Sequence, residues 1–291
     1  MSEVSFKNIA EEQVWDREVK AKANLFDLHL KEVWNYRDLI MLFVWRDFIA
    51  QYKHTILGPA WQIIQPAITT GIFLLLFNKI AKIPTDGIAP IAFYMAGITT
   101  WNYFSSCISN ISTTFVANAY IFGKVYFPRL VLPISFVISN LIKFGLQFLL
   151  LVIVMIYYHF NGYPIHLSSN LFFIPLLLIQ LAALALGLGI IISSVTTKYR
   201  DFAVLLGFTL QLMMYVTPVV YPLSYVTDER YRWLIEINPV TNIIESFRLC
   251  LFNVGSVTLK GELFSIGFTG IVLMVGIVLF NRVEKTFIDT V

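Results

Sequence analysis

Five long stretches without a charged side chain divide this sequence and limit what it can fold into. Lys, Arg, Asp and Glu are absent from residues 55–78, 91–123, 144–197, 202–227 and 263–281. An α-helix of about 20 apolar residues crosses the hydrocarbon core of a bilayer. The 291 residues are 57% hydrophobic and 13% charged, which is too little polar surface for folding in water. The stretches therefore predict membrane-spanning helices.

The predicted fold is an all-α polytopic membrane protein with six transmembrane helices. The turn-rich segment 161–170 divides the longest stretch. The spans are expected near residues 60–81, 91–116, 131–158, 171–195, 202–221 and 262–282. They form a transmembrane domain over 60–282, which follows a leader (1–36) and an interface helix (37–59) and precedes a short tail (283–291).

The distribution of positive charge predicts the orientation. With six spans, fourteen Lys and Arg residues lie on the side of the termini and six on the other side. Both termini are therefore expected in the cytoplasm. The N-terminal segment is charged and has no apolar core before about Leu39, so no cleavable signal peptide is expected.

Other features of composition exclude some functions. The net charge of +3 is small and forms no basic stripe, so nucleic acid is not an expected partner. Cys107 and Cys250 are expected to be small buried side chains that make no disulfide framework.

Residues 41–54 predict a helix with two unlike faces. Its apolar positions recur at helical spacing and are Met41, Val44, Trp45, Phe48, Ile49 and Tyr52. Its polar positions are Arg46, Asp47, Gln51 and His54. This pattern is typical of a helix that lies along the cytoplasmic membrane surface. The same pattern also fits a helix packed on its own protein, and the two readings are compatible.

The loop between spans two and three, residues 117–130, is short, aromatic and basic. Its notable residues are Asn118, Tyr120, Lys124, Tyr126, Phe127, Pro128 and Arg129. Exposed aromatic residues indicate a contact surface, so we expect this loop to bind a cytoplasmic partner. An aromatic belt at the membrane interface is the alternative.

The segment 222–261, between spans five and six, contains two apolar stretches too short to cross a membrane. Such stretches are typical of re-entrant helices, here at the outer mouth. Asn238 and Pro239 begin one of them, with Glu245 and Arg248 on the face opposite its apolar residues.

Polar side chains follow one face of spans two and three. The candidates for lining a path are Trp101, Asn102, Tyr103, Ser106, Ser109, Thr113, Asn140 and Lys143. Polar groups that face lipid cost several kcal/mol, so these faces turn inward, either to another helix or to water. Lys143 could also extend to the interface. A wet path of hydroxyls, amides and aromatic rings suits sugar polymers better than ions.

No sequence motif supplies an energy source. The chain has no phosphate-binding loop and no cluster with metal-ligand spacing, so we expect no cofactor, no metal and no enzymatic activity of its own. The six assigned spans contain no carboxylate except Glu262 at the start of the last, which argues against ion coupling. A separate ATPase, which would bind ATP and Mg, is therefore the expected motor.

Five ordered motifs resemble the permeases of polysaccharide-exporting ABC transporters, the family that exports O-antigen, teichoic acid and capsule. The motifs are Arg46-Asp47 through Gln65-Pro66, Lys124 to Pro133, Tyr199-Arg200-Asp201, Thr217 to Pro222, and Asn238-Pro239 through Glu245 and Arg248.

The resemblance implies a bacterial inner-membrane permease that moves a lipid-linked glycan. It implies a channel formed by two copies and driven by two ATPase subunits, with 118–129 as the coupling helix. It also implies that 41–54, with Arg46, Asp47 and Tyr52, lies beside that helix at the membrane surface. A gate at the outer exit would include Pro218, Tyr221, Pro222, Asn238, Pro239, Glu245 and Arg248.

Two other functions remain open on the sequence. A permease for a drug or a small lipid has the same architecture but predicts a closed apolar cleft. A membrane-embedded glycosyltransferase ranks last, because the chain has no cytoplasmic domain for a nucleotide sugar and no paired carboxylates for acid–base work.

Overall fold

The structure is a computed structural model that describes residues 30–53, 55–122, 124–162, 169–199 and 201–287. All regular elements in these residues are helical. The α-helices are α1 (Leu30–Asn35), α2 (Arg37–Tyr52), α3 (Trp61–Phe73), α4 (Pro90–Ser112), α5 (Thr114–Ala117), α6 (Ala119–Phe122), α7 (Val131–Phe160), α8 (Ile174–Thr196), α9 (Asp201–Val216), α10 (Glu229–Glu236), α11 (Pro239–Phe252) and α12 (Leu259–Phe287). Gly58–Ala60, Ser169–Phe173 and Leu223–Tyr225 are short 3₁₀ helices, and Leu74–Ile80 is a π-helix. The all-α prediction is confirmed for this part of the chain.

Four helical segments are long and apolar enough to cross a membrane: Gly58–Ile80, Val131–Phe160, Asn170–Thr196 and Leu259–Arg282. They correspond to expected spans one, three, four and six. The chain is thus a multi-pass membrane protein. The two other expected spans, α4 and α9, differ from these four in composition or length, so the number six stays a prediction.

Helix α4 lies at the centre of the bundle. It has the 23 residues of a full span, but its Asn and Ser residues make it more polar than the four apolar segments. It contacts α3, α7, α8, α9 and α11, and most of its side chains are buried. Because neighbouring helices cover α4, its polar groups have protein rather than lipid around them.

Helix α9 is shorter than the expected span 202–221. It has 16 residues, or about 24 Å of helix, and ends at Val216. The chain then turns through Thr217 to Val220, all of which are buried. Pro218 has no backbone N–H with which to continue the helix, so α9 ends five residues before the expected boundary, and the turn approaches α11, as described below.

Glycines allow close approach of the last span to α8. A Cβ atom on Gly187 would lie 2.9 Å from the backbone of Leu273, and one on Gly276 would lie 2.8 Å from the carbonyl oxygen of Gly187. Small residues at such crossings let van der Waals contact hold membrane helices together. Helices α8 and α12 therefore pack closely against each other, and α8 in turn packs against α4.

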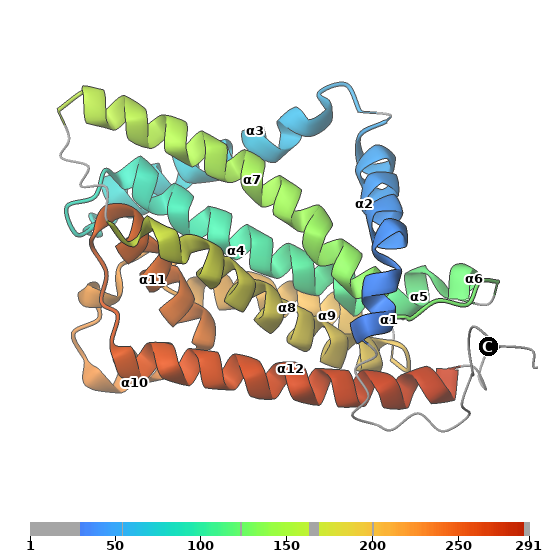
Figure 1. Cartoon of the computed structure of the whole chain (residues 1–291). Coiled ribbons are helices and arrows are strands. Elements are labelled where there is room, and N and C mark those ends of the chain that lie inside the picture. The colour runs from blue at the N-terminus through green and yellow to red at the C-terminus, as the bar shows by residue number, and fades with distance from the viewer. Residues whose placement is uncertain (1–29, 54, 123, 163–168, 200, 288–291) are drawn as a thin grey trace, which may run out of the picture.

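The two ends of the bundle carry different elements (Figure 1). At one end lie α1, α2, α5, α6 and the C-terminal end of α12, and α2 runs there at a steep angle to the long helices. Helices α10 and α11 lie toward the other end, where α11 packs against α12, α4 and α8. Most of the leader 1–36, the end of the tail 283–291, and the motif residues His54 and Arg200 lie outside the described residues.

Candidate functional site

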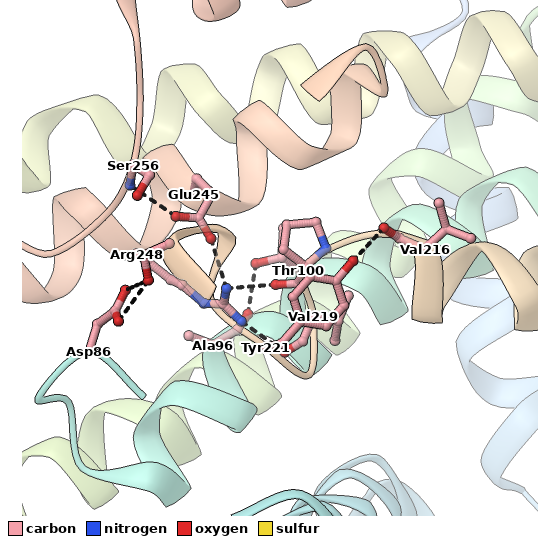
Figure 2. Close-up of polar contacts among 11 residues, drawn as sticks. Asp86, Ala96, Thr100, Val216, Val219, Tyr221, Glu245, Arg248 and Ser256 are labelled. Carbon is pink, nitrogen blue, oxygen red and sulfur yellow. Dashed lines mark hydrogen bonds and ion pairs between the residues drawn. The ribbon is translucent and has the colours of Figure 1, made fainter. Parts of the chain in front are cut away.

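Two of the gate residues predicted from sequence, Pro218 and Glu245, contact the side chain of Arg248, which is 1% exposed. Its guanidinium Nη1 donates to the carbonyl oxygen of Pro218 at 2.6 Å, and Nη2 donates to that of Val219 at 2.8 Å. Figure 2 shows these contacts between α11 and the turn that follows α9. One arginine thus donates hydrogen bonds to two successive carbonyl groups of an irregular segment. The planar guanidinium, with several N–H donors in one plane, suits such a pair of acceptors.

Glu245 balances the charge of Arg248. Its Oε1 lies 3.0 Å from Nη1, and its Oε2 accepts a hydrogen bond of 3.1 Å from the backbone N–H of Ser256. The ring of Phe93 on α4 lies under the guanidinium, with the Cζ atom 3.8 Å from the ring centroid. A buried ion pair persists only with such further contacts, because desolvation of both charges is costly.

Gly97 on α4 makes room for this arrangement. A Cβ atom there would lie 2.7 Å from the carbonyl oxygen of Val219 and 2.8 Å from Nη2 of Arg248. Any larger residue therefore pushes the turn or the guanidinium out of place. Phe93 and Gly97 are one helical turn apart on α4, and neither is among the gate residues predicted from sequence.

The remaining gate residues fix the start of α11 and the turn. Asn238 caps α11 by accepting from the N–H of Val240 at 3.1 Å, and its Nδ2 donates to Thr217 Oγ1 at 2.9 Å. The hydroxyl of Tyr221 donates to the carbonyl oxygen of Val216 at 2.8 Å. Ser224 donates to the carboxylate of Asp86 at 2.7 Å and joins this region to the loop before α4. The structure thus brings most of the predicted gate residues together.

The predicted docking loop divides into inward and outward residues. Phe127 is 4% exposed, and its ring lies 5.7 Å from that of Phe43 on α2 and 5.5 Å from that of Phe122. Arg129 is 7% exposed and lies over Phe122, 5.4 Å from the ring centroid. Asn118 is also buried, whereas Pro128 is partly buried. These residues position the loop rather than forming its outer surface.

The outward residues of the loop are Tyr120, Lys124 and Tyr126. Tyr120 is 64% exposed and Tyr126 is 71% exposed. Val125, which lies between Lys124 and Tyr126, is also exposed. These residues form an aromatic and basic surface at the end of the bundle. The contact of Phe127 with Phe43 packs the loop that carries this surface against α2.

Helix α2 has two apolar faces rather than one. Ile40, Phe43 and Val44 are buried, and α2 packs against α7. Met41 and Trp45 are more than half exposed. Arg46 and Asp47 pair at 2.7 Å. Helix α2 thus packs on its own protein through one face and presents an apolar face outward.

The polar residues of expected spans two and three have mixed roles. Asn102 donates to Gln147 at 3.3 Å and Asn110 to Asn140 at 3.5 Å, so these pairs join α4 to α7. Trp101 and Tyr103 are buried. Ser109 is exposed, and Ser106, Thr113 and Lys143 are partly exposed. Helix α4 therefore contacts α7 through Asn102 and Asn110, and Ser106, Ser109 and Thr113 form a partly exposed polar strip on it.

Comparison with known proteins identifies the family. The model of the ABC-2 type transporter family matches residues 38–252. This chain belongs to the ABC-2 type transporter family. The O-antigen export system permease protein RfbA of Klebsiella pneumoniae is 31% identical over 254 residues, which cover 87% of this chain and 94% of that protein. The protein of the same name from Myxococcus xanthus is 30% identical over 226 residues, which cover 77% and 84%.

Membership of the ABC-2 family confirms the resemblance stated from the motifs. It also confirms the expectation of a transport subunit that works with a separate ATPase, rather than an enzyme. The matched region extends from α2 to the end of α11, so the Arg248 site and the loop 117–130 both lie inside it.

Proposed function

We propose that this chain is the permease subunit of an ATP-driven exporter that moves a lipid-linked polysaccharide across the bacterial inner membrane. The observation that carries the proposal is its similarity, over most of both chains, to proteins named O-antigen export system permeases. The surface of Tyr120, Lys124 and Tyr126 supports it, because a permease driven by a separate ATPase needs a cytoplasmic contact.

In this proposal, both termini lie in the cytoplasm and six helices cross the membrane. Helices α4 and α9 complete the set of six, and α10 and α11 are re-entrant helices at the outer gate. The position of α1 and the end of α12 at one end of the bundle supports this topology (Figure 1). A reporter enzyme that works only in the cytoplasm is expected to be active when fused after Val291, and an inactive fusion would contradict the orientation.

The complex contains two copies of this chain and two ATPase subunits, which bind the ATP and Mg. The translocation path follows the polar strip of α4 where two copies meet, because one copy with six helices has little room for a hydrated glycan. Helix α2 lies at the cytoplasmic membrane surface, where its exposed Met41 and Trp45 contact lipid.

The test of this function is export in the source bacterium. Deletion of the gene is expected to remove a surface polysaccharide and to leave lipid-linked polymer in the cytoplasmic leaflet, and the intact gene is expected to restore export. A deletion strain with normal surface glycans and an altered sensitivity to drugs would instead support export of a drug or small lipid.

A further inference from the structure

A cleft of about 420 Å³ lies between α2, α4 and α7. Its polar lining comes from Asp47 and Gln51 of α2, Asn110 of α4, and Ser139 and Lys143 of α7. This volume lies within the range of small-molecule sites, roughly 300–1,000 Å³. A smaller hollow shares Lys143 and is lined also by Asn102 and Gln147.

Several polar groups of this cleft lack a partner among the described residues, although Asn110 donates to Asn140. Lys143 is partly buried and has no hydrogen bond or ion pair with any residue that the structure describes. Asp47 Oδ1 pairs with Arg46, but Asp47 Oδ2 and Ser139 Oγ are buried and have no hydrogen-bond partner in the part of the chain that the structure describes. Buried polar atoms usually have partners, so a set that lacks them indicates a ligand or water.

The charges of the cleft select the chemistry of that ligand. Two cations, Arg46 and Lys143, accompany the single carboxylate of Asp47, which pairs with Arg46, so the net charge in and beside the cleft is positive. An ammonium group binds phosphate oxygens well. The carboxylate and amide oxygens of Asp47 and Gln51 accept hydrogen bonds, which hydroxyl groups donate. The cleft therefore suits a phosphate with neighbouring hydroxyls.

The walls of the cleft indicate that this group belongs to a lipid. Phe48, Phe136 and Ile142 line it beside the polar residues. Ile142 and its neighbour Leu141 are each more than 40% exposed on α7, next to Lys143. An alkyl chain attached to the phosphate could therefore leave the cleft along an apolar surface.

We propose that the cleft between α2 and α7 binds the headgroup of a lipid that carries phosphate next to hydroxyl groups, with the phosphate at Lys143. The proposal rests on the proposed function only in placing α2 at the membrane surface, where lipid can reach the cleft. Lys143 lies about 18 Å along α7 from Val131, below the surface of Tyr120 and Tyr126. A lipid bound there would sit between the cytoplasmic contact surface and the polar strip of α4.

The test measures protection of a cysteine in the cleft. Ala50→Cys, at a lining position of the cleft to which no ligand contact is assigned, is labelled with a charged thiol reagent in a full-length chain with Cys107 and Cys250 replaced by Ser, in detergent micelles without phospholipid. Addition of a polyprenyl diphosphate sugar or of phosphatidylglycerol is expected to slow labelling, and comparison of the two distinguishes the transported lipid from bulk phospholipid. A glycosyl diacylglycerol, which has no phosphate, is expected to give no protection.

Variants at Lys143 decide the role of the ammonium group. Lys143→Gln is expected to weaken protection roughly tenfold, as the loss of one charge-assisted contact implies. Lys143→Arg, which keeps the charge, is expected to retain most of it. The matched control is Lys79→Gln, which removes an exposed cation outside the cleft. Equal protection in the Lys143→Gln and Lys143→Arg variants would overturn the proposal, as would equal protection by the lipid without phosphate. Because labelling needs no ATPase, these outcomes are separate from a failure of export.

Discussion

At the scale of single residues, Arg248 shows how a buried charge can organise irregular backbone. Its partners are two carbonyl oxygens, a carboxylate and an aromatic face, contributed by three separate segments of the chain. The sequence placed Glu245 and Arg248 together on one side of a helix but left that side without an assigned partner. The missing partners are backbone atoms of a turn about thirty residues earlier, and backbone atoms leave no residue-specific signal.

Removal of the Arg248 side chain should destabilise the fold strongly. Arg248→Ala leaves the Glu245 carboxylate and the carbonyl oxygens of Pro218 and Val219 buried without this donor, so we expect a loss of about 3–5 kcal/mol in unfolding free energy. Unfolding of the purified protein in detergent measures the change.

The exposed pair Arg232–Glu236 provides the matched control for Arg248. Its side chains are 37% and 36% exposed, so Arg232→Ala should change stability by less than about 1 kcal/mol. The double variant Arg248→Met, Glu245→Met should lose less than Arg248→Ala, because no charge is left uncompensated. Equal effects of Arg248→Ala and Arg232→Ala would refute the central role of the buried pair.

Gly97 should tolerate no side chain. Gly97→Ala places a methyl group against Val219 and Arg248, so we expect a loss of about 1–3 kcal/mol in unfolding free energy by overpacking. Gly145→Ala on α7 meets nothing within 4 Å and should be neutral or slightly stabilising, because alanine favours a helix. Thermal unfolding of the two variants side by side measures the difference, and equal midpoints would argue against the close approach.

At the scale of elements, the hydrophobic pattern predicted the bounds of the helices well where a helix is apolar along its whole length. The expected span 131–158 is α7 (Val131–Phe160), and the expected span 60–81 is Gly58–Ile80. The pattern failed to show which face of a segment turns inward. Phe127 and Tyr126 are adjacent aromatic residues, yet one is buried against Phe43 and the other is exposed. Tertiary contact with α2, which is distant in sequence, decides between them.

Variants of the loop should separate contact with the ATPase from positioning of the loop. Tyr126→Ala with Lys124→Glu removes the exposed surface, so we expect a folded permease with weaker ATPase binding and at least a tenfold loss of export. Phe127→Ala should instead lower the stability of the permease itself, by about 3–5 kcal/mol, because it empties a buried aromatic site.

Co-purification with the ATPase and unfolding of the isolated permease distinguish these effects. The exposed residue Tyr231 on α10, at the opposite end of the bundle, offers a control: Tyr231→Ala should leave ATPase binding unchanged. Normal ATPase binding by the Tyr126 and Lys124 variant would contradict the docking role of this surface.

At the scale of the whole molecule, the polar strip of α4 predicts where water enters. Single cysteines at 102, 106, 109 and 113, without Cys107 and Cys250, should differ in reactivity toward a charged thiol reagent during export. We expect position 109 to react fastest, because Ser109 is exposed, and position 102 slowest, because Asn102 contacts Gln147.

Lipid exposure and water exposure must be separated in this measurement. Ile153 on α7 is 54% exposed in the chain but lies on an apolar face, so Ile153→Cys should stay unreactive in the membrane. If all four α4 positions are as unreactive as 153 in a transporter trapped during export, the strip is packing between helices rather than a path.

The central position of α4 also has a consequence for how the protein is made. A helix with this many amide and hydroxyl groups inserts poorly into lipid by itself, since each such group needs a partner. Its covers α7 and α8 lie later in the chain and are synthesised after it. During synthesis α4 is therefore expected to stay next to α3 and the insertion machinery until α7 and α8, which cover its polar groups, have been synthesised. Biogenesis of this permease should for that reason depend on the order and timing of its helices as much as on their hydrophobicity.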